Sequence, residues 1–141
     1  MARYAVIGLG RFGMTVARIL AENGMEVIAI DKDQDLVNEI SSVVTSAVCM
    51  DSTDEAALRA QNLNEADAVI IGIGSNIEEC ILTAAILKKI GVGIIYAKIE
   101  SELHGRILKI LGVQHTLLPE EIVGNQLAKT LVSRNVLEYI N

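Results

Sequence analysis

Three glycines near the amino terminus have the spacing of a phosphate-binding turn. Gly8, Gly10 and Gly13 belong to the stretch GLGRFG, which follows the apolar run RYAVI and precedes a helical pattern. In this context the first glycine ends a strand, the second lets a diphosphate approach the backbone, and the third lets a helix pack closely against the sheet. The diphosphate then binds the exposed N–H groups at the helix N-terminus. This pattern predicts a nucleotide site, and the alternative is a purely structural glycine turn.

Two aspartates at the ends of later apolar runs suit other parts of a nucleotide. Asp31 comes about 20 residues after Gly10, where a carboxylate accepts hydrogen bonds from a ribose diol and repels a 2′-phosphate. We therefore expect NADP to be disfavoured. Asp51 ends the next run and can meet the exocyclic amino group of adenine. Each aspartate could instead only cap a helix, and Ser52 or Thr53 can cap the helix that follows Asp51.

A loop of small residues and two lysines complete the candidate site. The loop GIGSN lets a ligand pass close to the backbone. Its candidate ligand contacts are Ile73, Gly74 and Asn76. Lys98 follows a later apolar run and points to the same carboxyl edge of the predicted sheet, where ligands of open α/β sheets bind. We also assign Lys32, which follows Asp31, to the nucleotide site.

Arg11 is an unusual residue for the middle of a glycine turn. One interpretation is a solvated side chain, because a plain dinucleotide-binding turn tolerates many residues there. The other is a phosphate clamp that reaches a terminal phosphate, in its own site or in a neighbour's. The second interpretation would make Arg11 a sensor of the ligand's phosphate chain.

No catalytic set accompanies these residues in the sequence. There is no Ser/His/Asp arrangement with a plausible placement and no Tyr-x-x-x-Lys motif, and we interpret His104 and His115 as structural or surface residues. Cys49 and Cys80 lack metal-ligand spacing, so we interpret both as buried, reduced thiols. We therefore expect a binding protein that is not an enzyme. The alternative is a cofactor-binding fragment of an NAD-dependent oxidoreductase.

Short apolar runs alternate with helical patterns along the whole chain. Because the connections are short, the alternation predicts parallel strands with helices on both faces of the sheet. The predicted strands are 4–8, 26–30, 47–50, 68–73, 94–99 and 115–118. The predicted helices are 11–23, 33–42, 53–62, 76–91, 101–111 and 119–135. The fold class is α/β, a Rossmann-like doubly wound parallel sheet of about six strands.

Size and charge narrow the function further. The 141 residues predict one domain, and the formal net charge of −6 without a basic stripe argues against nucleic acid. No apolar stretch approaches the roughly 18 residues of a membrane span. The N-terminus lacks the pattern of a signal peptide. We therefore expect a cytoplasmic protein. Apolar residues within 81–87 and 122–132 predict at least a dimer. For residues 81–87, burial within the same domain is the alternative.

Several motifs, in this order, resemble one known family. They are GLGRFG, Asp31, the DSTD stretch at 51–54, GIGSN, AKI at 97–99, GV at 112–113 and PEEIVGNQLA at 119–128. The ordered set is similar to the N-terminal nucleotide-binding domain of RCK (regulator of K⁺ conductance) proteins, and most of all to Ktr/Trk-type regulatory subunits of bacterial potassium uptake systems. The ending NVLEYI is similar to KtrA-like members. The resemblance covers essentially the whole chain.

The resemblance implies a cytosolic subunit that binds ATP, ADP, NAD⁺ or NADH and gates a membrane-embedded potassium transporter. Such subunits form homodimers and octameric rings on the inner face of the membrane, and ligand exchange reshapes the ring. By position, the implied phosphate contacts are Gly8, Gly10, Arg11, Phe12 and Gly13, the ribose contact is Asp31, and the contacts near the base are Asp51, Ser52 and Thr53. Lys98 matches a basic family position, and Glu120 matches an acidic one near the dimer interface and a bound cation.

The chain departs from the family pattern at two places. The third-strand motif commonly reads Gly-Asp-Ala-Thr, whereas Met50 and Ser52 replace its glycine and alanine here. The C-terminal lobe that usually follows is absent from residues 1–141, which we therefore expect to form the nucleotide-binding domain alone.

Overall fold

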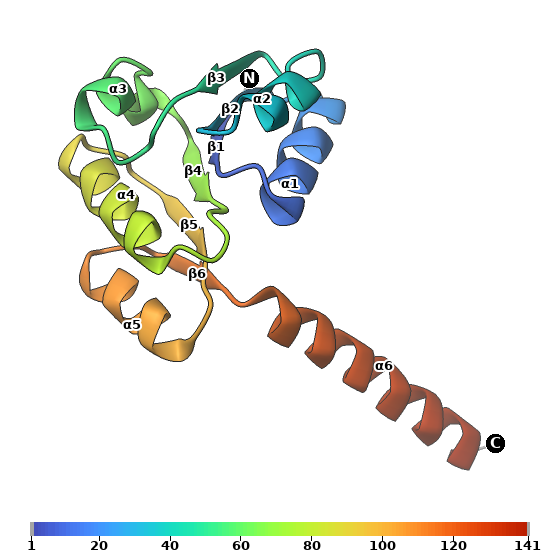
Figure 1. Cartoon of the computed structure of the whole chain (residues 1–141). Helices are drawn as coiled ribbons and strands as arrows, with labels where there is room; N and C mark the ends of the chain where they lie inside the picture. Colours follow the sequence, from blue (N-terminus) through green and yellow to red (C-terminus); the bar gives the residue numbers. More distant parts are fainter. Residues whose placement is uncertain (1, 141) are drawn as a thin grey trace.

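Six parallel strands form one sheet in the order β3-β2-β1-β4-β5-β6, as Figure 1 shows. The computed structural model describes residues 2–140, and side chains through residue 136. The strands are β1 (Arg3–Ile7), β2 (Glu26–Asp31), β3 (Ser46–Cys49), β4 (Ala68–Ile71), β5 (Ile95–Lys98) and β6 (His115–Leu117). The chain builds outward from β1 to β3, returns to β4 beside β1, and builds outward again. This topology confirms the predicted doubly wound sheet.

The helices also match the predicted segments, with differences at their ends. They are α1 (Arg11–Glu22), α2 (Gln34–Ile40), α3 (Glu55–Arg59), α4 (Ile77–Lys89), α5 (Glu102–Ile110) and α6 (Pro119–Ile140), with a short 3₁₀ helix η1 (Leu63–Glu65) after α3. The sequence did not predict η1, and α6 continues beyond the predicted end at residue 135. Gly24 and Gly91, which follow the C-caps of α1 and α4, have positive φ angles that are typical of helix ends. No described helix is long and apolar enough to cross a lipid bilayer.

The two faces of the sheet bury separate apolar clusters. Because successive side chains of a strand point to opposite faces, Ala5 and Ile7 of β1 belong to one cluster and Val6 to the other. The Ala5 cluster includes side chains from α3, α4 and α5, whereas the Val6 cluster includes side chains from α1 and α2. Helices therefore cover both faces of the sheet.

Helices α4 and α6 differ in how they use their apolar residues. In α4, Ala84, Ile86 and Leu87 are buried, and Leu82 is exposed. Burial within the domain therefore accounts for most of the apolar residues between 81 and 87. Helix α6 instead extends away from the sheet (Figure 1), and its large apolar side chains between residues 122 and 136 are exposed, Leu127 by 58%.

The cysteines correct one expectation. Cys80 of α4 is buried, as predicted, and burial raises the pKa of its thiol to about 11. Cys49 is exposed, so the prediction of two buried thiols was wrong for this residue. The reason is its position in β3, an edge strand that has a neighbour on one side only.

Candidate functional site

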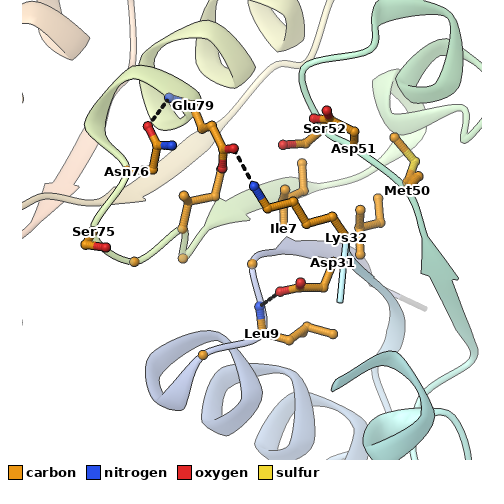
Figure 2. A pocket seen from close by; sticks show the side chains of 16 residues that line it. Ile7, Leu9, Asp31, Lys32, Met50, Asp51, Ser52, Ser75, Asn76 and Glu79 are labelled. Atoms are coloured by element: carbon orange, nitrogen blue, oxygen red, sulfur yellow. Dashed lines mark hydrogen bonds and ion pairs between the residues drawn. The ribbon is translucent and has the colours of Figure 1, made fainter. Parts of the chain in front are cut away.

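A cavity of about 280 Å³ lies where the strand order reverses, at the carboxyl ends of β1, β2 and β4. Crevices at this switch point are where open α/β sheets bind ligands. Its lining includes most of the predicted contacts, namely Gly8, Gly10, Asp31, Lys32, Asp51, Ser52, Ile73, Gly74 and Asn76. Figure 2 shows side chains from several of these segments around one space. The fold therefore brings together residues that are up to 68 positions apart, from Gly8 to Asn76.

The glycine turn is held by contacts that leave no room for a side chain at two of its three glycines. Gly8 has a φ of +97°, and a Cβ there would lie 2.6 Å from the backbone nitrogen of Ile73. A Cβ on Gly13 would lie 1.8 Å from the carbonyl oxygen of Gly8. At Gly10, by contrast, a Cβ would meet nothing within 4 Å. Close packing therefore excludes a side chain at Gly8 and Gly13, whereas Gly10 borders open space.

The N-terminus of α1 opens directly from this turn. Gly10 is the N-cap residue, its side chain cannot cap, and the first turn contains no acidic residue. The first N–H groups of a helix have no partner within the helix, and they carry the positive end of its dipole. This end of α1 is therefore suited to bind the diphosphate of a nucleotide.

Asp31 connects the end of β2 to the glycine turn. Its Oδ2 accepts a hydrogen bond of 2.7 Å from Leu9 N, and its Oδ1 accepts one of 2.8 Å from Asp33 N. Asp33, in turn, caps α2 by accepting a bond from Asp35 N. Each Asp31 oxygen retains a further lone pair, so the carboxylate can accept ribose hydroxyls without releasing the turn.

Asp51 follows β3, the strand that pairs with β2, and lines the same cavity as Asp31. Its Oδ1 accepts hydrogen bonds from the hydroxyl and from the backbone N–H of Thr53, which lower the pKa of Asp51, and the charge of Lys32 lowers it further. The carboxylate is therefore ionised at neutral pH and can accept a hydrogen bond from an adenine amino group. The capping prediction needs correction, because Asp54, and neither Ser52 nor Thr53, caps α3. Ser52 instead shares a 2.7 Å hydrogen bond with Thr83.

Glu79 is a lining residue that the sequence did not predict. It lies in the first turn of α4, where its backbone N–H donates to Asn76, the N-cap. Its carboxylate pairs with Lys32 across the cavity. The position three residues after the cap could have indicated that Glu79 faces the same edge as the GIGSN loop, but nothing local indicates Lys32 as its partner.

Six predicted contacts do not line this cavity. One is Gly13, which is buried against the carbonyl oxygen of Gly8. Phe12 packs against the core on the Val6 side of the sheet, so only its backbone can face a ligand there. Arg11 is exposed on the first turn of α1. The Thr53 hydroxyl donates a hydrogen bond to Asp51. The Nζ of Lys98 lies 3.7 Å from Oε1 of Glu100. Glu120 is exposed at the start of α6. Within residues 2–136, no group of three or more His, Cys, Asp or Glu side chains is placed to hold a metal ion.

A family model of the TrkA-N domain matches residues 4–119. The chain belongs to the TrkA-N family. A relative of this TrkA-N chain is Ktr system potassium uptake protein C of Bacillus subtilis (strain 168), which is 44% identical over 137 residues. The match covers 97% of this chain and 62% of that relative, so this TrkA-N chain spans less than two thirds of the relative's length.

Solved structures share the TrkA-N fold at low sequence identity. The NAD(P)-binding domain of an exopolyphosphatase-related protein from Archaeoglobus fulgidus superposes with a TM-score of 0.83 at 23% identity, covering 94% of this chain and 99% of that one. The GsuK channel bound to NAD superposes with a TM-score of 0.77 at 16% identity, covering 89% of this chain and 23% of the channel chain. These comparisons support the Rossmann-like fold.

Proposed function

We propose that residues 1–141 form a nucleotide-sensing domain that regulates a membrane potassium transporter of the Ktr/Trk type. The observation that carries the proposal is the cavity at the switch point, where the open N-terminus of α1 and the Asp31 carboxylate lie on the same wall. The similarity to a Ktr system potassium uptake protein supports the potassium transporter as the partner.

The chemistry of the cavity favours an adenine nucleotide, either ATP or ADP, or NAD⁺ or NADH. The N–H groups at the start of α1 suit the diphosphate, Asp31 suits the ribose diol, and Asp51 suits the adenine amino group. The space beside Gly10 allows the diphosphate to approach the backbone closely. Each part of the ligand thus has a chemically matched group at the same edge of the sheet.

Regulation requires that two conformations bind the ligand with different affinities. Arg11 lies outside the cavity on the first turn of α1, so in this proposal its guanidinium contacts a terminal phosphate that extends beyond the cavity, or one in a neighbouring subunit. ATP and ADP differ in that phosphate, which makes Arg11 the group that distinguishes them. The exposed apolar residues of α6 support assembly as a homodimer, and the family resemblance implies that such dimers form a homo-octameric ring.

Three further parts of the proposal follow from the family resemblance. The assembly lies on the cytoplasmic face of the cell membrane through its transporter partner. Glu120, exposed at the start of α6, contributes to a cation site between subunits. Lys98, beside Glu100 at the end of β5, contacts the ligand from the edge of the site.

A thermal-shift screen tests the nucleotide site, because a ligand stabilises the native state according to its occupancy. ATP, ADP, NAD⁺ and NADH are compared with NADPH and with GDP. We expect stabilisation by one or more of the adenine nucleotides that have a free ribose diol, and no turnover of the bound ligand. Absence of any shift would contradict the proposed function. Hydride transfer from NADH to a substrate would instead support an oxidoreductase.

A further inference from the structure

A lysine and a glutamate from the two halves of the sheet meet across the cavity. Lys32 Nζ lies 2.5 Å from Glu79 Oε1. Lys32 directly follows β2, on one side of the switch point, and Glu79 lies in the first turn of α4, on the other side. Figure 2 shows the Lys32 side chain extended across the space toward Glu79. Both residues line the cavity.

Among the described residues that line the cavity, Lys32 is the one cation, and three carboxylates line the cavity with it. They belong to Asp31, Asp51 and Glu79. The hydrogen bond to Glu79 raises the pKa of Lys32, and the charges of Glu79, Asp51 and Asp31 raise it further against the opposing effect of desolvation. The ammonium group therefore stays charged, and its charge is offset within the cavity.

A cation at this position decides how a site treats a ribose 2′-phosphate. Sites that accept NADP place an arginine near the 2′-oxygen, whereas a carboxylate at the end of β2 binds the free hydroxyl and repels the phosphate. Lys32 is adjacent to Asp31 and could offset that repulsion. However, its Nζ already contacts Glu79, so a phosphate oxygen that approached the Nζ would also approach the Glu79 carboxylate.

We propose that Glu79 is a specificity-determining residue that pairs with Lys32 and thereby prevents this lysine from binding the 2′-phosphate of an adenine nucleotide. The inference rests on the proposed nucleotide site and adds a second source of selectivity to Asp31. Because Asp31 still repels the 2′-phosphate, loss of Glu79 should reduce the preference for a free 2′-hydroxyl over a 2′-phosphate without reversing it.

The test compares two ligands that differ only at the ribose 2′-position, ADP-ribose and 2′-phospho-ADP-ribose. Their affinities are measured by calorimetry on the whole chain and on Glu79→Gln, with Glu79→Ala as a second variant. The Lys32 side chain is 61% exposed. Because exposed ion pairs contribute little to stability, both variants should fold. We expect the preference for ADP-ribose to fall about tenfold, since the Lys32 ammonium, freed from Glu79, then attracts a phosphate a few ångströms away.

Two control variants separate this role from a general effect of charge. Glu78 is the exposed neighbour of Glu79 in the same turn of α4, and Glu78→Gln removes the same charge without touching Lys32. It should leave the preference unchanged. In Glu79→Gln combined with Lys32→Met, the gain for 2′-phospho-ADP-ribose should disappear, because the freed cation is gone.

The outcomes distinguish this inference from the proposed function. If ATP, ADP, NAD⁺, NADH and ADP-ribose all fail to bind the unaltered chain, the proposed function fails and the inference fails with it. If one of the nucleotides binds but ADP-ribose does not, the inference alone is overturned. If ADP-ribose binds but Glu79→Gln changes both affinities by the same factor, the pair only supports the architecture of the site and the inference is overturned. An equal gain in Glu78→Gln would also overturn it.

Discussion

The carboxylate of Asp31 holds the backbone N–H of Leu9 at 2.7 Å, and so ties the end of β2 to the glycine turn. The residue predicted to bind the ribose therefore also positions the loop predicted to bind the diphosphate. This dual role means that a substitution of Asp31 affects the ligand in two ways, one direct and one through the loop.

Replacing Asp31 with alanine should weaken ligands that have a free ribose diol by about 1–3 kcal/mol, because hydrogen bonds to a charged group are lost. The effect through the loop is common to all ligands, whereas the direct effect requires the diol. Calorimetry with ADP and 2′-deoxy-ADP separates the two contributions. We expect a larger loss for ADP, and equal losses would indicate that Asp31 acts only on the turn.

Alanine should affect different properties at two glycines of the turn, the stability at Gly13 and the ligand affinity at Gly10. Gly13→Ala places a methyl group against the Gly8 carbonyl oxygen and should lower the free energy of unfolding by about 3 kcal/mol, the upper range of overpacking. Gly10→Ala has room for its methyl group in the free protein, so stability should hardly change while ADP affinity falls. Urea denaturation and calorimetry measure both effects. A stable Gly13→Ala protein would contradict the close contact.

Arg11→Ala should weaken ATP more than ADP, by roughly 1.5–3 kcal/mol, if the guanidinium contacts a terminal phosphate through charge-assisted hydrogen bonds. Arg18 provides the matched control, since it is a half-exposed arginine on the same helix that lies near Glu22. Arg18→Ala should affect both ligands equally and slightly. Equal losses of ATP and ADP affinity in Arg11→Ala would leave Arg11 as a solvated residue.

His104 should make the stability depend on pH below its ordinary pKa of about 6.5. The side chain is buried, its Nδ1 accepts a hydrogen bond from Glu100 N, and burial lowers its pKa, with Glu100 partly opposing the shift. The unfolded chain therefore binds a proton at higher pH than the native state does. The native state is fully stable above the unfolded pKa and loses stability as the pH falls toward the lower, native pKa.

Urea denaturation between pH 7.5 and pH 5.5, a window of roughly one unit to either side of an unperturbed histidine, measures this dependence. His104→Asn retains an acceptor without titrating in this range, so the decline in stability toward low pH should be smaller. His115 is exposed and stacks on Tyr96 at 4.3 Å between ring centroids, and His115→Gln should keep the decline. A decline that persists in His104→Asn would assign it to other groups.

The exposed apolar residues of α6 predict at least a dimer. Leu127 and Leu131 are 58% and 55% exposed, and replacing both with glutamate should convert the dimer to a monomer, because charges would be buried at the interface. Lys129→Glu, an exposed polar position on the same helix, should leave the assembly unchanged. Light scattering measures the mass. A monomeric unaltered chain at high concentration, with nucleotide present, would contradict the prediction.

Local patterns in the sequence were sufficient to predict the sheet, its helices and the glycine turn that opens α1. The alternation of short apolar runs with helical segments allows few topologies, because short connections require parallel strands. The spacing of Gly8, Gly10 and Gly13 and the position of Asp31 reflect backbone geometry within a single strand-helix-strand unit. Such features depend on residues that are close in the sequence, so they could be predicted without the structure.

The features that only the tertiary structure decided depend on contacts between distant segments. Lys32 and Glu79 are 47 positions apart, and no pattern around either residue indicates the other. The exposure of Cys49 follows from the place of β3 at the edge of the sheet, and only the structure shows that Arg11 lies outside the cavity that Gly8 and Gly10 line. The sequence predicted Ser52 or Thr53 as the cap of α3, whereas the structure has Asp54 as the N-cap, with its side chain accepting a hydrogen bond from Ala57 N. The sequence by itself determined which residues could bind a nucleotide, and packing between elements determined which of them share one cavity.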